Sequence, residues 1–195
     1  GAMLIEEAPG GLRFRARRVE IINGIAQQAA LAIQNDLLQK EMVIRERLET
    51  EVQLARQIQQ TFIPDVLPTH PHWQLSARWR TARQVGGDFY DVIELPDDRL
   101  GFFIADVADK GMPAALFMAL TRTLLRAAAR DSTSPAEALT RVNELLLPDT
   151  KQGMFVTAVF AVLDQNSGEL TYANAGHCPP LWVRHDSLER LTRTG

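Results

Sequence analysis

The sequence predicts an α+β fold preceded by a long N-terminal helix, and three observations indicate this. First, residues 18–62 contain no proline and a single glycine, which permits one continuous helix. Second, the segments that follow are typical of strands at 85–107, two helices between 111 and 147, and strands again after 155. Third, 46% hydrophobic residues in a chain of 195 are enough for a core. Strands interrupted by a pair of helices are typical of a sheet that helices cover on one face.

The N-terminal helix is expected to lie exposed to solvent. At 1.5 Å per residue it would span about 65 Å, which is too long for the interior of a small domain. Asp36 with Lys40 and Glu41 with Arg45 are acid-before-base pairs four residues apart, and such pairs support an exposed helix. Pro64 then stops the helix, because proline removes a backbone donor.

An apolar stripe on this helix predicts a parallel coiled-coil homodimer. Apolar residues recur at three- and four-residue steps at Ile44, Leu48, Val52, Ala55, Ile58 and Phe62. Two chains side by side would cover this stripe. Glu41, Arg45 or Glu51 intrudes in every heptad register. An imperfect register suits a signalling linker that shifts between two packings, and it also suits a plain imperfect helix.

The stretch 85–107 carries the main chemical signal. Two apolar runs flank a tight turn at residues 95–98, which predicts a β-hairpin. Asp88 stands at the head of the first run and Asp106 at the tail of the second, so the hairpin would bring them together. Gly86 and Gly87 allow the backbone to approach closely there. Because adjacent carboxylates repel one another unless a cation lies between them, we interpret the pair as half of a metal site. The alternative is that each Asp is only a turn or cap residue.

Local patterns predict the remaining elements. Apolar and polar residues alternate over 73–79, as in a half-buried strand. A proline in the first turn opens a helix over 112–130. Ser134 as N-cap, with Glu137 three residues later, forms a capping box for a second helix that ends near residue 147. Further strands are expected at 155–163, 170–173, 180–183 and 188–191.

Composition and charge indicate which partners and which cellular compartment to expect. The formal net charge is −3 and the basic residues are scattered, apart from a cluster at 13–18, so nucleic acid is not expected as a partner. A single cysteine excludes an internal disulfide and fits a reducing compartment. No apolar run of membrane-spanning length and no signal-peptide pattern are present, so we expect a cytoplasmic chain without membrane contact. Residues 1–3 are typical of a cloning remnant, so we expect a piece of a longer protein.

Four motifs carry a resemblance to a known family. They are G-G-D-F-Y-D at 86–91, A-D-V-A-D-K-G-M-P-A-A-L at 105–116, F-V-T-A-V-F at 155–160 and Y-A-N-A-G-H at 172–177. Together they resemble the metal-dependent Ser/Thr protein phosphatases (PPM family), specifically the bacterial SpoIIE/RsbU branch. Residues 27–35 are similar to the closing helix of a GAF sensor domain, and residues 54–68 to the linker helix that precedes such phosphatases.

The first residues and the resemblance together indicate three regions. They are a tag remnant with the tail of an upstream sensor at 1–17, a linker helix at 18–63 that ends the GAF domain and continues as the coiled coil, and a partial phosphatase domain at 72–195. The phosphatase fold it implies is a sandwich of two β-sheets flanked by helices, with two Mn²⁺ or Mg²⁺ ions at one end. Its implied substrate is a phosphorylated STAS-type anti-anti-sigma protein of a partner-switching pathway.

The resemblance also implies roles for individual residues. Asp106 would bridge both metals, Val107 would contribute its main-chain carbonyl, and Asp88 would bind metal directly or through water. Asp88 and Asp106 would therefore be the catalytic residues. Two metals that share a carboxylate hold a hydroxide for in-line attack on phosphoserine or phosphothreonine, which needs no covalent enzyme intermediate.

Other polar residues receive weaker predictions. Asp91 lies three residues past Asp88, on the opposite strand face, so it is left out of the ligand set. Asp109 and Lys110 could tune the site or face substrate, or serve only the turn. His177 is expected to shape a strand junction rather than to bind phosphate. Cys178 is expected to be a small buried residue rather than a nucleophile.

One departure from the family pattern bears on activity. Family members continue with a T-D-G-containing strand and a late D-D pair that complete the metal shell, and the present sequence shows neither before Gly195. We therefore expect a C-terminally truncated domain that binds metal weakly and is catalytically impaired. Two other functions remain open: a non-catalytic dimerisation or signal-transmission module, and a degenerate phosphatase fold that docks a phosphoprotein.

Overall fold

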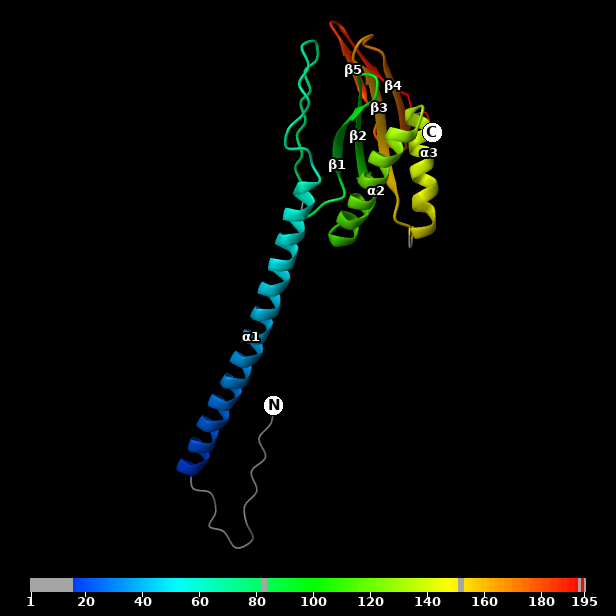
Figure 1. The fold of residues 1–195 in the computed structure, drawn as a ribbon. Helices are drawn as coiled ribbons and strands as arrows, with labels where there is room; N and C mark the ends of the chain where they lie inside the picture. The colour runs from blue at the N-terminus through cyan, green and yellow to red at the C-terminus, as the bar shows by residue number, and fades with distance from the viewer. Residues whose placement is uncertain (1–15, 82–83, 151–152, 193, 195) are drawn as a thin grey trace. The chain divides into compact units, whose positions relative to one another are not determined.

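The computed structural model describes residues 16–81, 84–150, 153–192 and 194, so most of the predicted tag remnant and sensor tail lies outside the described residues. Two compact units are present, one ending at Glu51 and the other running from Val52 to Gly195. Figure 1 labels the helices and strands.

Helix α1 (Ala16–Thr61) has 46 residues and matches the predicted linker helix. The expected pair forms, with Lys40 Nζ 2.8 Å from Asp36 Oδ2. Arg45 instead pairs forward with Glu49, at 3.0 Å, and not with Glu41. The prediction of a Glu41–Arg45 pair was wrong because Glu49 lies one turn onward on the same face and competes for the guanidinium.

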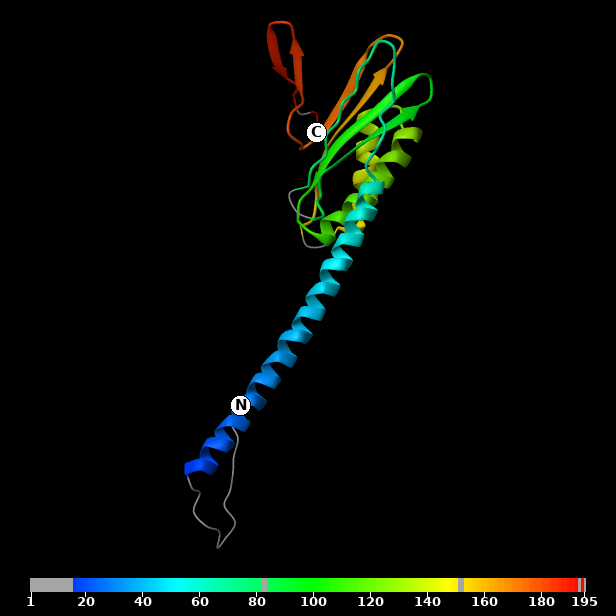
Figure 2. The same cartoon turned by 90° about the vertical axis from the view of Figure 1, so that its left-hand side faces the viewer.

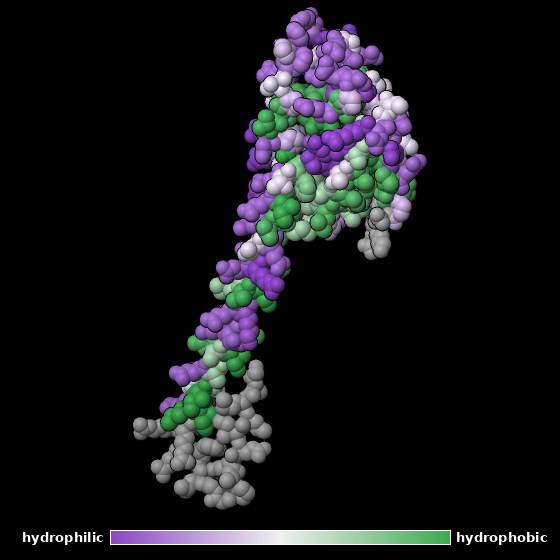
Figure 3. Space-filling model, viewed as in Figure 1, coloured by the Kyte–Doolittle hydropathy of each residue, from purple (hydrophilic) through white to green (hydrophobic). Residues whose placement is uncertain are grey.

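Apolar side chains on α1 remain exposed in the single chain. Figure 3 shows apolar surface recurring along this helix between polar bands. From residue 37 onward, the exposed large apolar residues of this helix are Leu37, Leu38, Met42, Val43, Ile44, Leu48, Leu54 and Ile58. A second copy would cover such a stripe, and the homodimer stays a prediction.

The second unit is built on a four-stranded antiparallel sheet in the order β1-β2-β3-β4. Its strands are β1 (Phe89–Leu95), β2 (Arg99–Val107), β3 (Val156–Asp164) and β4 (Leu170–Ala175). A separate two-stranded sheet pairs β5 (Leu181–Arg184) with β6 (Ser187–Arg190), and Figure 2 shows it apart from the larger sheet. The turn between β1 and β2 places Asp97 and Asp98 at positive φ, which Asp tolerates better than most residues. The mixed fold with an antiparallel sheet and helices is confirmed.

Helices α2 (Met112–Asp131) and α3 (Pro135–Leu146) cover one face of this sheet, followed by a short 3₁₀ helix, η1 (Leu147–Asp149). α2 packs on β1 and β2, while α3 packs on β3 and β4. The predicted cap of α3 forms, because the Glu137 backbone N–H donates to Ser134 Oγ at 3.2 Å. The Glu137 carboxylate reaches back to the Thr133 N–H at 2.7 Å, one residue before the N-cap.

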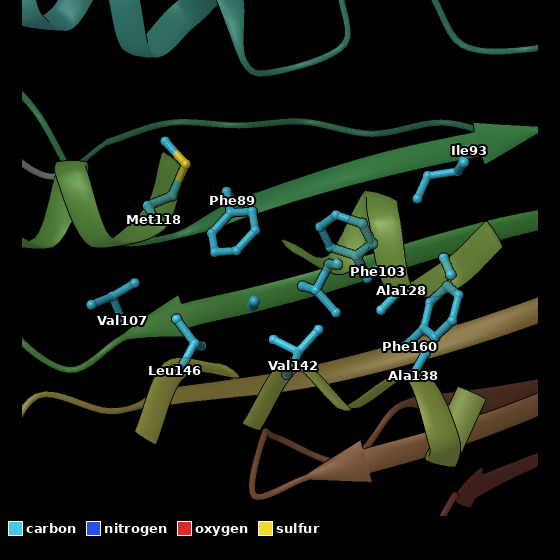
Figure 4. Packing of buried hydrophobic residues seen from close by; sticks show 14 of the residues in the cluster. Phe89, Ile93, Phe103, Val107, Met118, Ala128, Ala138, Val142, Leu146 and Phe160 are labelled. Carbon is cyan, nitrogen blue, oxygen red and sulfur yellow. The ribbon is translucent and has the colours of Figure 1, made fainter. Parts of the chain in front are cut away.

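The core lies between the sheet and the two helices. In Figure 4 the rings of Phe89, Phe103 and Phe160, from three neighbouring strands, point toward side chains of α2 and α3. Their edge-to-face contacts have ring centroids 5.8 and 6.3 Å apart. All three are at most 2% exposed. Rings packed this way stabilise the sheet by about 1 kcal/mol per pair beyond their buried area.

The strand predicted at 73–79 does not form. Trp73 makes only an isolated bridge with His70, and the rest of the segment has no ladder within the described part of the chain. Trp79, one of the apolar residues in the alternating pattern, packs against the core without belonging to a strand. Its indole N–H donates to the Asp88 carbonyl at 2.8 Å. A strand needs a neighbour for its backbone groups, and the sequence pattern alone does not supply one.

Among the helices of the described residues, none combines the length and apolar character needed to cross a membrane.

Candidate metal centre

The β1–β2 hairpin brings the two predicted carboxylates together. Phe89 pairs with Ala105 across the hairpin, so the register continued by one residue sets Asp88 opposite Asp106. Both side chains lie on the sheet face away from the helix-covered core, since the neighbours Phe89 and Ala105 are buried. Both line a cavity of about 490 Å³. The structure thus places the predicted pair at one site.

The two carboxylates strain each other electrostatically. Burial raises the pKa of Asp106 above its ordinary value, and hydrogen bonding to Asp88 and repulsion from its charge raise it further. The nearby His177 partly offsets this rise in the pKa. A carboxylate pair that resists double ionisation is the arrangement that a divalent cation relieves.

Gly87 and Val107 lie close together at the cavity that the pair lines, and the Val107 carbonyl faces Gly87, which has no side chain. A Cβ on Gly87 would lie 2.7 Å from the Val107 carbonyl oxygen and 2.9 Å from its Cβ. Such distances are closer than real Cβ atoms come, so only glycine fits against this backbone. The donor set of two carboxylates and one carbonyl consists of oxygens alone, which suits Mn²⁺ or Mg²⁺.

Two contacts that the sequence analysis did not predict hold the backbone before Asp88. The side-chain amide of Gln59, in the last turn of α1, bonds both backbone groups of Gly86, donating to its carbonyl at 2.5 Å and accepting from its N–H at 3.1 Å. Trp79 donates to the Asp88 carbonyl. A polar residue on a long charged helix is usually solvent-facing, so no local signal distinguishes Gln59.

A second polar group lies near Asp106 on the neighbouring strand. Thr157 pairs with Asp106 in the β2–β3 ladder, and its hydroxyl lies 2.8 Å from His177 Nδ1. The buried amide of Asn174 closes the turn by accepting from the His177 N–H at 2.8 Å and donating to its carbonyl at 3.3 Å. These bonds fit the expectation that His177 shapes a strand junction, and they also place its ring beside the carboxylate pair.

Asp91 lies outside the site, on the opposite face of β1 as predicted. Its carboxylate is fully buried and pairs with Arg122 at 2.9 Å and Arg126 at 2.5 Å, both from α2. A buried charge is tolerated only with such partners, so Asp91 fastens α2 to the sheet.

Three remaining candidates differ in their surroundings. Asp109 and Lys110 line the same cavity as the carboxylate pair, and Asp109 Oδ1 accepts from the Lys110 backbone N–H at 2.7 Å. Cys178 is exposed, so the prediction of a buried cysteine was wrong. The cysteine lies in the loop between β4 and β5, where no layer covers it. Within the described residues, no three His, Cys, Asp or Glu side chains converge as a metal cluster.

The fold and the hairpin site define a class of protein. Residues 96–195, which include Asp106 but not Asp88, match the family profile described as "Stage II sporulation protein E (SpoIIE)". The chain belongs to this SpoIIE family, within the PPM-type phosphatase group of the SpoIIE/RsbU kind.

Individual relatives agree with this assignment. The chain is 37% identical over 173 residues to Protein IcfG of Synechocystis sp., covering 74% of this chain and 27% of that protein. It is 28% identical over 136 residues to the phosphoserine phosphatase RsbU of Bacillus subtilis, covering 70% and 40%. The chain therefore spans less than half the length of these curated relatives.

Solved structures show the same fold. The RsbU and RsbW domains of Rv1364c from Mycobacterium tuberculosis match with a TM-score of 0.51 at 35% identity, covering 60% of this chain and 32% of that one. The SiaA-PP2C domain of Pseudomonas aeruginosa matches with a TM-score of 0.60 at 20% identity, covering 76% and 61%. The second likeness shows the fold alone.

Proposed function

We propose that the chain is the catalytic core of a Mn²⁺- or Mg²⁺-dependent protein serine/threonine phosphatase. The observation that carries this proposal is the convergence of Asp88, Asp106 and the Val107 carbonyl on one cavity. Relatives named as phosphoserine phosphatases support the reaction type. The raised pKa of Asp106 supports the metal, because burial and the neighbouring Asp88 both disfavour the charged carboxylate, and a bound cation would stabilise that charged form.

Each residue of the site would have its own role. Asp106, Asp88 and the Val107 carbonyl would hold the ions, which when bound lower the pKa of a coordinated water and polarise the phosphoryl oxygens. Gly87 avoids the clash that any side chain would make with the Val107 carbonyl. Lys110, on the same cavity, offers a positive charge to a phosphate group. Two carboxylates and one carbonyl leave about half of six coordination positions to water, so these residues alone should bind metal weakly and turn over slowly.

As the family resemblance implies, we propose that the substrate is a serine- or threonine-phosphorylated protein of the STAS-type anti-anti-sigma class. Support comes from the RsbU relative and from the Mycobacterium tuberculosis structure that holds RsbU and RsbW domains together. The linker at 18–63 of one chain would pair with the same linker of a second chain through the exposed apolar stripe. The paired linkers would carry a signal from an upstream sensor.

A second candidate function is docking of a phosphoprotein without turnover. The observation that favours it is that no cluster of three ligating side chains exists among the residues described. A competent two-metal centre requires more oxygen donors than the pair at 88 and 106 provides.

Dephosphorylation assays separate these functions. We expect Mn²⁺-dependent release of phosphate from a serine-phosphorylated STAS-domain protein, and a loss of at least about 100-fold for Asp88→Asn or Asp106→Asn, as for groups that stabilise transition-state charge. The matched control is Asp97→Asn, the same chemical change at the exposed turn of the same hairpin, where Asn also tolerates positive φ. Binding of the phosphoprotein with no Mn²⁺-dependent turnover would favour docking and contradict the phosphatase proposal.

A further inference from the structure

A buried glutamine connects the linker helix to the strand that carries Asp88. Gln59 lies in the last turn of α1 and is only 3% exposed, although most of the helix is open to solvent. Its side-chain amide uses its carbonyl oxygen and its NH₂ on the two backbone groups of Gly86. This two-bond contact spans 27 residues of sequence and holds the two peptide units on either side of the Gly86 Cα, one through its N–H and the other through its carbonyl.

The residue that Gln59 holds is two positions from the metal-binding carboxylate. Gly86 is followed by Gly87, which touches the Val107 backbone, and then by Asp88. Because Gly87 leaves no free space against Val107, a shift of Gly86 would move the chain relative to the carbonyl and to Asp106. The indole of Trp79 holds the Asp88 carbonyl from the other end of this segment.

The end of α1 is itself fixed in the second unit. The Ile63 side chain lies in the core at 8% exposure, and the Tyr90 hydroxyl donates to the Pro64 carbonyl at 3.2 Å. The Arg122 guanidinium lies 5.7 Å from the centre of the Phe62 ring. Several contacts thus attach the end of α1 to the second unit, and among these the Gln59 contact is the one made with the segment next to Asp88.

Packing alone does not account for a glutamine here. An aliphatic side chain could fill the same space without removing an amide from water, which costs free energy unless both of its polar atoms find partners. Both partners of Gln59 are backbone groups of Gly86, which lies in a loop, and Gln59 supplies the hydrogen bonds that these two groups need. The pairing therefore sets where residues 86–88 lie.

We propose that Gln59 is a positioning residue for the metal centre: through Gly86, the last turn of α1 sets the place of Gly87 and Asp88 against Val107 and Asp106. This inference rests on the proposed function, since it assigns Gln59 to the same metal site. It gives the linker helix a direct route to the carboxylate pair, through the segment that leads into β1.

The test compares Mn²⁺ binding by wild-type chain, Gln59→Leu and Gln59→Glu, using calorimetry and the electron paramagnetic resonance signal of free Mn²⁺. Gln60→Leu is the matched control, because Gln60 is the exposed neighbour on the same turn. We expect Gln59→Leu to weaken Mn²⁺ binding about 10-fold or more, as removal of outer-shell support does. Gln59→Glu keeps an acceptor for the Gly86 N–H but loses the donor to the Gly86 carbonyl, so it should also weaken Mn²⁺ binding. Excess Mn²⁺ should restore phosphatase turnover in both variants.

Each outcome has a defined meaning. Equal Mn²⁺ affinity of Gln59→Leu and wild type would overturn the positioning role and leave the phosphatase proposal untouched. If Gln59→Leu does not fold, the Gln59→Glu result decides by the same criterion, and failure of both to fold would overturn the role in favour of a purely structural one. Wild-type Mn²⁺ binding that Gln59→Leu weakens, without any turnover, would support the inference while refuting the phosphatase. Wild-type chain that binds no Mn²⁺ would overturn both.

Discussion

Replacing Gly87 by alanine should damage the metal centre from a position that carries no ligand. The added Cβ would lie 2.7 Å from the Val107 carbonyl oxygen, and that pair must separate to at least 3.0 Å, or to 3.4 Å for ordinary contact. The atoms in the way are the Val107 backbone and Cβ, so no flexible side chain can yield. A displacement of several tenths of an ångström exceeds the tolerance of roughly 0.2 Å on metal–ligand distances.

We expect two measurable effects of Gly87→Ala. Overpacking of this kind costs about 1–3 kcal/mol of stability, which urea unfolding measures. Mn²⁺ affinity should fall about 10-fold or more, as when the support of a ligand is lost. Gly24→Ala is the control, because a Cβ there meets nothing within 4 Å and Ala favours the helix. Unchanged Mn²⁺ affinity in a folded Gly87→Ala chain would refute the assignment of the Val107 carbonyl to the site.

Three further predictions concern charge, assembly and the core. The pKa of Asp106 is raised in the folded chain, so without metal the folded state holds this proton more tightly than the unfolded state, and stability falls as pH rises from the ordinary Asp value of 3.8 through the raised pKa. Asp106→Asn should therefore raise the thermal midpoint in EDTA at pH 7; a lower midpoint would contradict the electrostatic reasoning. Leu48→Glu with Val52→Glu should convert a dimer to a monomer in light scattering, and an unchanged mass would count against the coiled coil. Asp91→Ala should cost about 3–5 kcal/mol in urea unfolding, because two arginines of α2 lose their buried partner, and a cost below about 1 kcal/mol would show that this ion pair is dispensable.

The sequence predicted the carboxylate pair because local rules govern a hairpin. A short turn sets the register, and the register decides which residues oppose each other, so Asp88 and Asp106 could be placed together without further contacts. The capping box at Ser134 was predictable for the same reason, since its partners lie within one helical turn. The metal-binding roles of the pair stay predictions.

Contacts between distant segments could not be predicted from local patterns. The bond between Gln59 and Gly86 depends on where the chain returns after the linker, which periodicity does not reveal. Residues 73–79 have the alternating pattern of a strand, but among the described residues their backbone has no strand beside it, and Trp79 packs against the core as a single side chain. Exposure of Cys178 depends likewise on which layer covers the β4–β5 loop.

Anomalous diffraction from crystals grown with Mn²⁺ would test the central claim most directly. We expect a manganese peak between the two carboxylates, roughly 2.0–2.6 Å from an oxygen of Asp106 and from the Val107 carbonyl, with Asp88 in direct or water-mediated contact. Density for Mn²⁺ only elsewhere on the chain, with the side chains of Asp88 and Asp106 turned to separate surroundings, would contradict it.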